Sequence, residues 1–264
     1  RKLLKSYLLV GLYTVAVIFV INLQVSIAAT QEVSFQNDGF ILCGTLSIPD
    51  NSTLKIHPAA VLVPGSGVSD RDETVTINGV ILKPFKEIAE ALEKSGFVVL
   101  RYDKRNFTMK QQGAAMREFD KIIPDTFIED AQAAIDFLKT RPKVDRHKII
   151  LIGHSEGATF APEIVASREL AGVVLIAPNL LQYRDGIIYQ IEYQIRFYER
   201  ENSNGQFNQD IANMKNLLKE LEDTLALIDS GRFPTGGYIL GANLAYYQRM
   251  QELTADVATR IRSM

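Results

Sequence analysis

The feature that most constrains this chain is the segment Gly153-His154-Ser155-Glu156-Gly157, which directly follows the apolar run 148–152. A serine between two glycines at the end of a strand is typical of a nucleophile elbow, a sharp strand-to-helix turn that raises the serine hydroxyl above the edge of a sheet. The residues that follow have helical spacing. An ordinary strand-turn-helix corner is the competing interpretation. We favour the elbow, with Ser155 as a nucleophile.

A serine hydroxyl is a weak nucleophile, so it needs a general base, nearly always a histidine, and an acid that orients this base. In sheets that carry this elbow, the acid and the histidine follow the serine in the chain. All three histidines of this sequence precede or belong to the elbow, and none follows Ser155. We therefore expect the catalytic Asp and His to lie beyond Met264, and we expect the 264 residues alone to be inactive.

None of the three histidines is expected to be the base. His154 is the neighbour of Ser155, and this position points its side chain away from the hydroxyl. His57 and His147 precede the strands expected at 59–63 and 149–152, so they lie at the opposite end of the sheet. A strand of six residues is about 20 Å long, whereas proton transfer needs about 3 Å.

The order of the expected elements predicts one α/β domain. A hairpin is expected around Asn37-Asp38-Gly39. The further strands are expected at 59–63, 97–102, 149–152 and 172–177. One helix is expected over 84–95, and another begins at a capping box formed by Thr126 and Glu129. Strands that alternate with helices indicate a mostly parallel sheet covered on both faces.

After Pro178 the pattern is helical, with stretches at about 186–200, 210–229 and 241–262 and no strand among them. The aromatic residues of the first stretch either wall an acyl pocket or pack helix on helix, and we favour the second interpretation; they are Tyr189, Tyr193, Phe197 and Tyr198. The chain is therefore divided into an N-terminal segment 1–29, a core 30–180 and a helical cap 181–264 that leads back toward the core.

Two loops are expected at the same edge of the sheet as Ser155. Acyl transfer needs two N–H donors for the oxyanion, and one of them belongs to the residue after the nucleophile, Glu156. The other comes from a loop after an earlier strand, and we assign it to Ser66, with Gly67 as the alternative and a plain tight turn as the competing interpretation. Asp103 ends a strand at this edge, where it either orients a ligand or pairs with the neighbouring Lys104 and Arg105.

Composition and charge exclude other classes of function. The formal net charge is −2, with acids and bases interspersed, so we expect no nucleic acid as a partner. The single cysteine, Cys43, cannot form an internal disulfide and is read as a small buried residue. No cluster of cysteine and histidine predicts a metal site, and no cofactor is expected.

The first 29 residues have the order of a secretory signal peptide. Basic residues precede an apolar stretch from Leu8 to Leu23, and small residues follow it. An uncleaved anchor is the competing interpretation, because the stretch is only slightly shorter than the ~20 residues that span a bilayer. We expect an exported protein, secreted or periplasmic, that contacts a membrane only through this segment if it is not cleaved.

Four motifs together resemble exported bacterial α/β-hydrolases, the esterase-like relatives of dienelactone hydrolase, prolyl oligopeptidase and serine aminopeptidase domains. The motifs are 61–67, 70–73, 100–105 and 152–157, and the resemblance runs from about residue 32 to 178. It implies an α/β-hydrolase fold with a helical cap insertion, its last strands missing from this sequence, and it places Arg71 and Asp72 with Asp103 at the edge of the site. The chain departs from the pattern at 106–109, where relatives tend to have a glycine-rich turn.

The resemblance implies a serine hydrolase that cleaves small-molecule carboxylic esters through an acyl-enzyme intermediate. A peptidase that acts on short peptides with the same chemistry is one alternative, because a fold does not separate the two activities. A non-catalytic binding protein that kept the elbow and lost the base is the other alternative, and its support is the absence of a usable histidine.

Overall fold

The computed structural model describes residues 29–49, 54–77 and 79–264. The segment interpreted as a signal peptide or anchor therefore lies outside the described residues, except for Ala29. Among the helices in the described ranges, none combines the length and the hydropathy needed to cross a bilayer.

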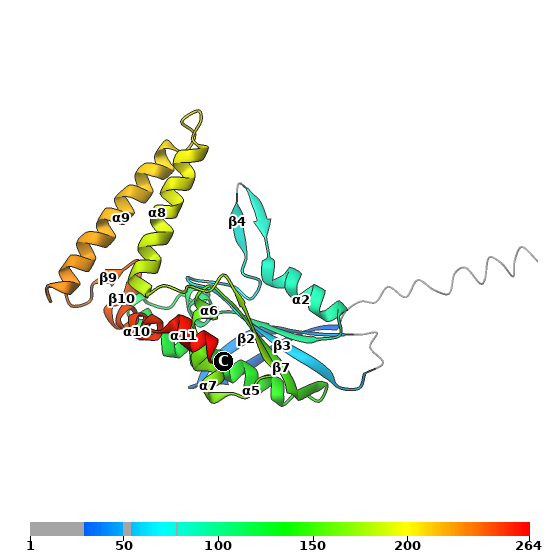
Figure 1. Cartoon of the computed structure of the whole chain (residues 1–264). Helices are drawn as coiled ribbons and strands as arrows, with labels where there is room; N and C mark the ends of the chain where they lie inside the picture. The colour runs from blue at the N-terminus through cyan, green and yellow to red at the C-terminus, as the bar shows by residue number, and fades with distance from the viewer. Residues whose placement is uncertain (1–28, 50–53, 78) are drawn as a thin grey trace, which may run out of the picture.

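A six-stranded sheet with the order β1-β2-β6-β3-β7-β8 forms the centre of the molecule (Figure 1). Its strands are β1 (Ala29–Asn37), β2 (Phe40–Ile48), β3 (His57–Val63), β6 (Val98–Tyr102), β7 (Val144–His154) and β8 (Gly172–Ile176). β1 and β2 form the predicted hairpin, and β2 runs antiparallel to β6. β3 is parallel to both β6 and β7, and β7 is parallel to β8. The predicted mostly parallel sheet is confirmed.

Both faces of the sheet are covered, which explains why β3 is apolar at successive positions. Ala59, Val61 and Val63 point into the larger core, together with α5 (Pro124–Lys139) and α7 (Ala161–Ser167). The alternate residues of β3 join a smaller cluster on the opposite face with Phe85 and Ala89 of α2 (Pro84–Lys94). The core therefore lies on both sides of β3.

One helix start differs from the sequence prediction. α5 begins at Pro124, two residues before the expected cap, and the Thr126 hydroxyl accepts a hydrogen bond of 3.3 Å from the Ile123 N–H. Thr126 therefore occupies the third helical position instead of the cap. The physical reason is proline, whose fixed φ suits the first turn of a helix and whose missing N–H costs nothing there.

Four short elements between β3 and α5 were not expected from the sequence. They are the hairpin of β4 (Val75–Ile77) and β5 (Val80–Leu82) and the helices α3 (Arg105–Gln111) and α4 (Met116–Phe119). Each is too short to show a clear apolar period. The 106–109 segment, which departs from the glycine-rich turn, lies in α3.

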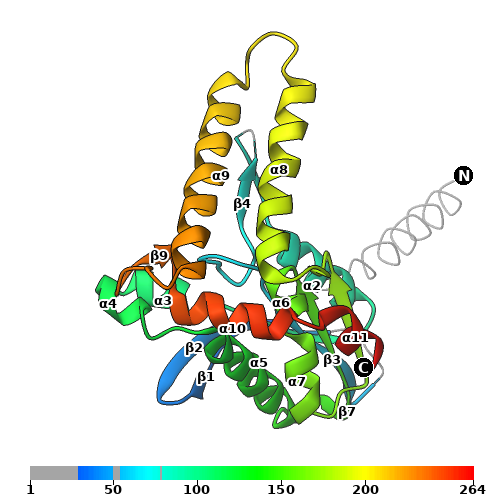
Figure 2. The ribbon, with the colours of Figure 1, turned by 60° about the vertical axis from the view of Figure 1, so that its left-hand side comes forward.

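After β8 the chain forms a long helical hairpin that projects away from the sheet, as Figure 2 shows. It consists of α8 (Tyr183–Glu201) and α9 (Asn208–Asp229). The expectation of an uninterrupted helix over 241–262 without strands was wrong. The region contains the two-residue strand β10 (Ala242–Asn243), which pairs with β9 (Tyr238–Ile239) just before it, then α10 (Leu244–Thr254) and α11 (Val257–Arg262). α10 buries Tyr246, Met250 and Leu253 in the larger core.

Candidate active site

Ser155 lies at a strained turn between β7 and α6 (Glu156–Thr159). Its φ is 50° and its ψ is −112°, a conformation that residues other than glycine rarely adopt. The Ser155 N–H donates to the Ile176 carbonyl of β8, which holds the turn at the end of the sheet. Strain of this kind persists only where the surroundings enforce it, and it is concentrated at functional sites.

The two glycines of the elbow are required by close backbone contacts. A Cβ on Gly157 would lie 2.3 Å from the Val63 carbonyl oxygen, and one on Gly153 would lie 2.6 Å from the Gly157 carbonyl oxygen. Both distances are too short for any side chain. The turn can therefore pack against the end of β3 only because these positions are glycine.

The 64–67 loop that follows β3 lies directly against the elbow. A Cβ on Gly65 would lie 3.2 Å from Ser155 Cβ and 3.2 Å from His154 Nδ1. Within the described ranges, the N–H groups of Ser66 and Glu156 have no hydrogen-bond acceptor. The two predicted oxyanion donors are thus unpaired N–H groups on adjacent segments. The alternative donor, Gly67, adopts a φ of +88° in the same loop.

A buried ion pair connects this loop to the elbow. Lys104 Nζ donates to the Gly65 carbonyl at 2.8 Å and lies 2.7 Å from Glu156 Oε2, and both charged side chains are only 4% exposed. The Tyr246 hydroxyl of α10 donates to the other carboxylate oxygen of Glu156. Burial, together with the charge of Glu156, raises the pKa of Tyr246 well above its usual value, so this hydroxyl keeps its proton. The Lys104 ammonium also lies 4.2 Å from the centre of the Phe127 ring.

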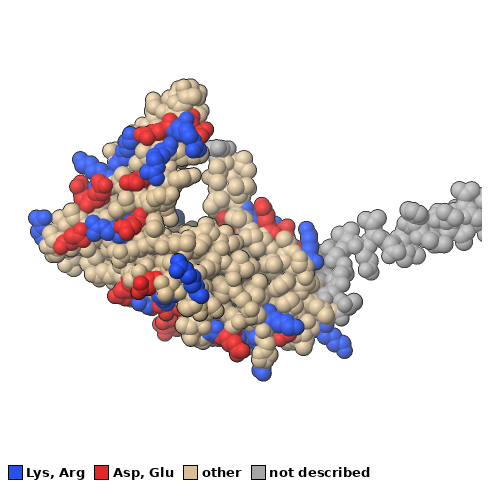
Figure 3. Space-filling model, viewed as in Figure 1, with Lys and Arg blue, Asp and Glu red and all other residues tan. Residues whose placement is uncertain are grey.

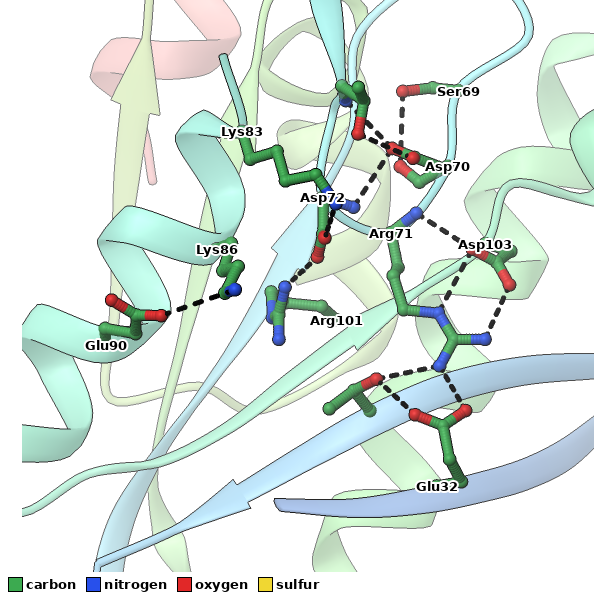
Figure 4. A network of polar contacts seen from close by, with 12 residues as sticks. Glu32, Ser69, Asp70, Arg71, Asp72, Lys83, Lys86, Glu90, Arg101 and Asp103 are labelled. Atoms are coloured by element: carbon green, nitrogen blue, oxygen red, sulfur yellow. Dashed lines mark hydrogen bonds and ion pairs between the residues drawn. The ribbon is translucent and has the colours of Figure 1, made fainter. Parts of the chain in front are cut away.

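Arg71 and Asp103, which were predicted at the edge of the site, bind each other. The Arg71 guanidinium donates to both oxygens of Asp103, at 3.1 Å and 2.7 Å, and the Arg71 backbone N–H donates to Asp103 Oδ1 at 2.9 Å (Figure 4). Arg71 also pairs with Glu32 of β1, and this hydrogen bond holds the pKa of Glu32 below its usual value. Lys104 and Arg105, the sequence neighbours considered as one of two alternatives for Asp103, pair instead with Glu156 and Asp130.

Asp72, the third residue predicted at this edge, also has charged partners. Its carboxylate pairs with Arg101 of β6 and lies 3.2 Å from Lys83 Nζ (Figure 4). Asp70 closes the same loop with hydrogen bonds to Thr74. These acidic and basic residues therefore fasten the 69–74 loop to the sheet, with their charges directed at one another.

The three histidines have partners other than Ser155. His154 Nδ1 lies 2.8 Å from Glu73 Oε1, and this hydrogen bond raises the pKa of His154 although burial opposes it. His57 Nδ1 lies 3.1 Å from the Gly96 carbonyl oxygen, at the start of β3. His147 lies within β7, which begins at Val144, and not before the strand as expected. Within the described ranges, no side chain is hydrogen-bonded to the Ser155 hydroxyl.

A pocket of about 450 Å³ lies beside the 64–67 loop. Ser66, Gly67 and Glu156 line it beside the elbow. Apolar walls come from α4, the loop between α4 and α5, α5 itself and the β9–β10 turn, and they include Phe119, Ile122, Phe127 and Leu240. Asn106 Nδ2 donates to the Gly67 carbonyl at 3.0 Å on the same side. The sequence did not indicate this pocket, because α5 meets there loops and short elements that have no clear apolar period.

The aromatic residues considered as pocket walls lie elsewhere. Tyr189 and Tyr193 are exposed and stack on each other, with ring centres 6.3 Å apart. Phe197 and Tyr198 are in contact at the far end of α8. None of the four lines the pocket beside Ser66. In the part of the chain that the structure describes, no group of three or more His, Cys, Asp or Glu residues could hold a metal ion.

Comparison with known proteins gives one family match and one curated relative. The sequence pattern of the family described as serine aminopeptidase (peptidase family S33) matches residues 82–195. Esterase EstD of Thermotoga maritima is 32% identical over 224 residues, a match that covers 83% of this chain and 47% of EstD. The chain thus spans about half the length of this curated relative.

Solved structures with a related fold are less similar in sequence. The α/β hydrolase GrgF from Penicillium sp. sh18 is 20% identical, covers 88% of this chain and 75% of its own, and has a TM-score of 0.48. Dienelactone hydrolase from Anabaena variabilis is 22% identical. The match covers 56% of this chain and 62% of the dienelactone hydrolase, with a TM-score of 0.43.

Proposed function

This chain is an α/β hydrolase, and from that premise we propose that it carries the nucleophile and the oxyanion donors of a serine esterase. The observation that supports this most directly is the position of Ser155. It occupies a strained turn, and the adjacent loop and elbow present two N–H groups, on Ser66 and Glu156, that have no acceptor among the described residues. Unpaired donors at a nucleophile are what the transition state of acyl transfer requires.

The proposed reaction proceeds in two steps. Ser155 Oγ loses its proton to the base and attacks the acyl carbon, and the two N–H groups stabilise the negative oxygen. The alcohol leaves with a proton, and water then hydrolyses the acyl-enzyme to release the acid and restore the serine. His57 and His154 have other partners, and the His147 ring accepts a hydrogen bond from the Arg146 side chain, so we propose that the base is a histidine outside these 264 residues.

The acyl group is proposed to lie in the pocket beside Ser66. This pocket begins at the proposed oxyanion donors and continues between apolar walls, so an acyl chain could extend into it from the carbonyl. Phe119 and Ile122 would contact the chain, and Lys104 and Glu156, which form the buried ion pair, also line the pocket. The walls favour an uncharged acyl group over a charged one.

Labelling with a fluorophosphonate tests the nucleophile. The full-length protein is expected to be labelled and to hydrolyse an aryl ester, and Ser155→Ala is expected to lose both activities. Ser66→Ala is the matched control, because it removes a hydroxyl but keeps the backbone N–H, and it should still be labelled. Labelling that persists in Ser155→Ala would exclude Ser155. A full-length protein that is neither labelled nor active would instead support a non-catalytic binding protein.

A peptidase is the second candidate, and the match to the serine aminopeptidase pattern over 82–195 favours it. Esterase EstD, whose match covers 83% of this chain, is named as an esterase, and this favours ester cleavage. The two are separated by measuring kcat/KM for an aryl ester and for an aminoacyl anilide with the same enzyme preparation. Cleavage of the ester alone excludes the peptidase, and efficient cleavage of the anilide would replace the esterase proposal.

A further inference from the structure

Two charged side chains hold the peptide groups on either side of Gly65. Glu73 Oε1 accepts from the Gly65 N–H at 2.6 Å, and Lys104 Nζ donates to the Gly65 carbonyl at 2.8 Å. The peptide bonds of the described residues are trans. In a trans peptide the C=O and the following N–H point in opposite directions within one plane. The direction of the Gly65 carbonyl therefore sets the direction of the Ser66 N–H.

We propose that Lys104 is a positioning residue of the oxyanion hole, which acts by holding the Gly65 carbonyl so that the Ser66 N–H is directed at the reacting oxygen. This inference rests on the proposed function. Lys104 acts through the backbone of the loop and need not touch the reacting atoms.

The partner of Lys104 strengthens this inference, because Glu156 is itself the residue that carries the other proposed donor. The Glu156 side chain lies 2.7 Å from Lys104 Nζ, and its backbone N–H begins α6 directly after Ser155. Lys104 thus contacts the side chain of Glu156, whose N–H is one proposed donor. It also contacts the Gly65 carbonyl, which directly precedes the other donor, the Ser66 N–H. It sets the position of the two N–H groups relative to each other.

Stability alone is a weak explanation for this ion pair. Transfer of two charges from water into the core costs free energy, and the attraction between them often does no more than offset this cost. Apolar residues of similar size therefore often stabilise a core at least as well as a buried ion pair. Lys104 and Glu156 are both 4% exposed, and they are further held by the Phe127 ring and the Tyr246 hydroxyl. An arrangement with so many fixed partners gives the loop one geometry, which is what a preorganised oxyanion hole needs.

Lys104→Met in the full-length protein tests the inference. Loss of a whole oxyanion donor lowers kcat by about 10²–10³-fold, and a misdirected donor should cost about 10–100-fold. KM should change by less than about threefold, because the donors act mainly on the transition state. The inhibition constant of a trifluoromethyl ketone, which forms a tetrahedral adduct with a serine, should rise in parallel with the loss of kcat.

The matched control is Arg105→Met. It breaks the buried pair with Asp130, in which the two side chains are 12% and 1% exposed, and it does not contact Gly65. It should lose stability but keep its kcat at temperatures where it is folded. Should Lys104→Met fail to fold, Lys104→Gln replaces it: its neutral side chain is too short to bond both Gly65 and Glu156, and the same separation of kcat and KM is expected.

Three results have distinct meanings. A folded Lys104 variant with a lower kcat, an unchanged KM and weaker inhibition by the ketone supports the inference. A folded variant with wild-type kcat overturns it, and so does a loss of kcat matched by Arg105→Met. A wild-type protein that neither hydrolyses esters nor reacts with fluorophosphonate overturns the proposed function itself, whatever the lysine variants do.

Discussion

The surroundings of Ser155 and the hairpin of α8 and α9 are stabilised in different ways. Around Ser155, backbone segments approach closely at Gly153 and Gly157, and buried charges bond to backbone groups of the adjacent loop. In the hairpin, apolar side chains pack against one another, with Ile191 and Ile195 facing Leu221 and Leu225. The first region depends on backbone geometry and the second on apolar area.

The charges of the two regions differ in the same way. On the hairpin, both basic and acidic side chains lie at the surface, as Figure 3 shows. Ion pairs there, such as Lys215 with Glu199, are about half exposed. Such pairs contribute little to stability. At the elbow, Lys104 and Glu156 are buried and fix a loop. An exposed pair of this kind can therefore be lost at little cost, whereas loss of one partner of the buried pair leaves an uncompensated charge beside the 64–67 loop.

The largest effect is expected for Gly157→Ala. The new Cβ would lie 2.3 Å from the Val63 carbonyl oxygen, so the elbow has to move or the strand has to shift. We expect a loss of about 3–5 kcal/mol in the free energy of unfolding, above the usual ~1–3 kcal/mol for overpacking because the contact is with backbone, measured by urea denaturation. Gly172→Ala is the control, because its Cβ would meet its nearest atom at 3.6 Å. Equal stability of the two variants would contradict the close contact.

The next effect is expected for Leu225→Ala in the hairpin. Leu225 is 1% exposed, and its removal should cost about 2–4 kcal/mol. Because the hairpin packs mainly on itself, the loss should appear as faster amide hydrogen exchange in α8 and α9, with little change in the sheet. Leu227→Ala is the control, since Leu227 is 37% exposed. Equal loss of protection in β3 and β7 would show that the hairpin and the core unfold as one unit.

Tyr246→Phe, beside the elbow, is expected to lower the free energy of unfolding by less than Leu225→Ala does. It removes one hydrogen bond to a buried carboxylate and leaves the Lys104 pair in place, so the free energy of unfolding should fall by about 1–3 kcal/mol. Tyr193→Phe, on an exposed side chain of α8, should be neutral. A neutral Tyr246→Phe in thermal denaturation would show that α10 contributes nothing to fixing Glu156.

The smallest effect concerns pH. The hydrogen bond with Glu73 raises the pKa of His154 above 6.5, with burial opposing it. The contribution of this pair is therefore fully present below pH 6.5 and is lost as pH rises through the raised pKa. Wild type should exceed His154→Asn in Tm at about pH 6 and lose most of that margin by about pH 9. A margin that stays constant over this range would contradict a charged His154.

Much of the fold followed from the sequence, because its strands and long helices have clear apolar patterns. The hairpin of β1 and β2 and the parallel strands were predicted, although β7 begins five residues before the expected strand. The two helices of the projecting hairpin lie within three residues of their expected bounds. The prediction was less accurate where elements are short. β9 and β10 have two residues each, too few to show an alternation, so β9 was not predicted and a helix was expected to include the residues of β10.

The sequence by itself determined the elbow, because two glycines around a serine at the end of an apolar strand permit a turn that few other residues allow. It also determined that the 64–67 loop and Asp103 lie at the same edge of the sheet, since the ends of parallel strands meet there. Only the tertiary structure decided the partners of the charges. Asp103 binds Arg71 and Lys104 binds Glu156, 32 and 52 residues away in the chain, instead of their neighbours. The physical reason is that a buried charge pairs with the group that packing brings within reach, and sequence distance has no part in that choice.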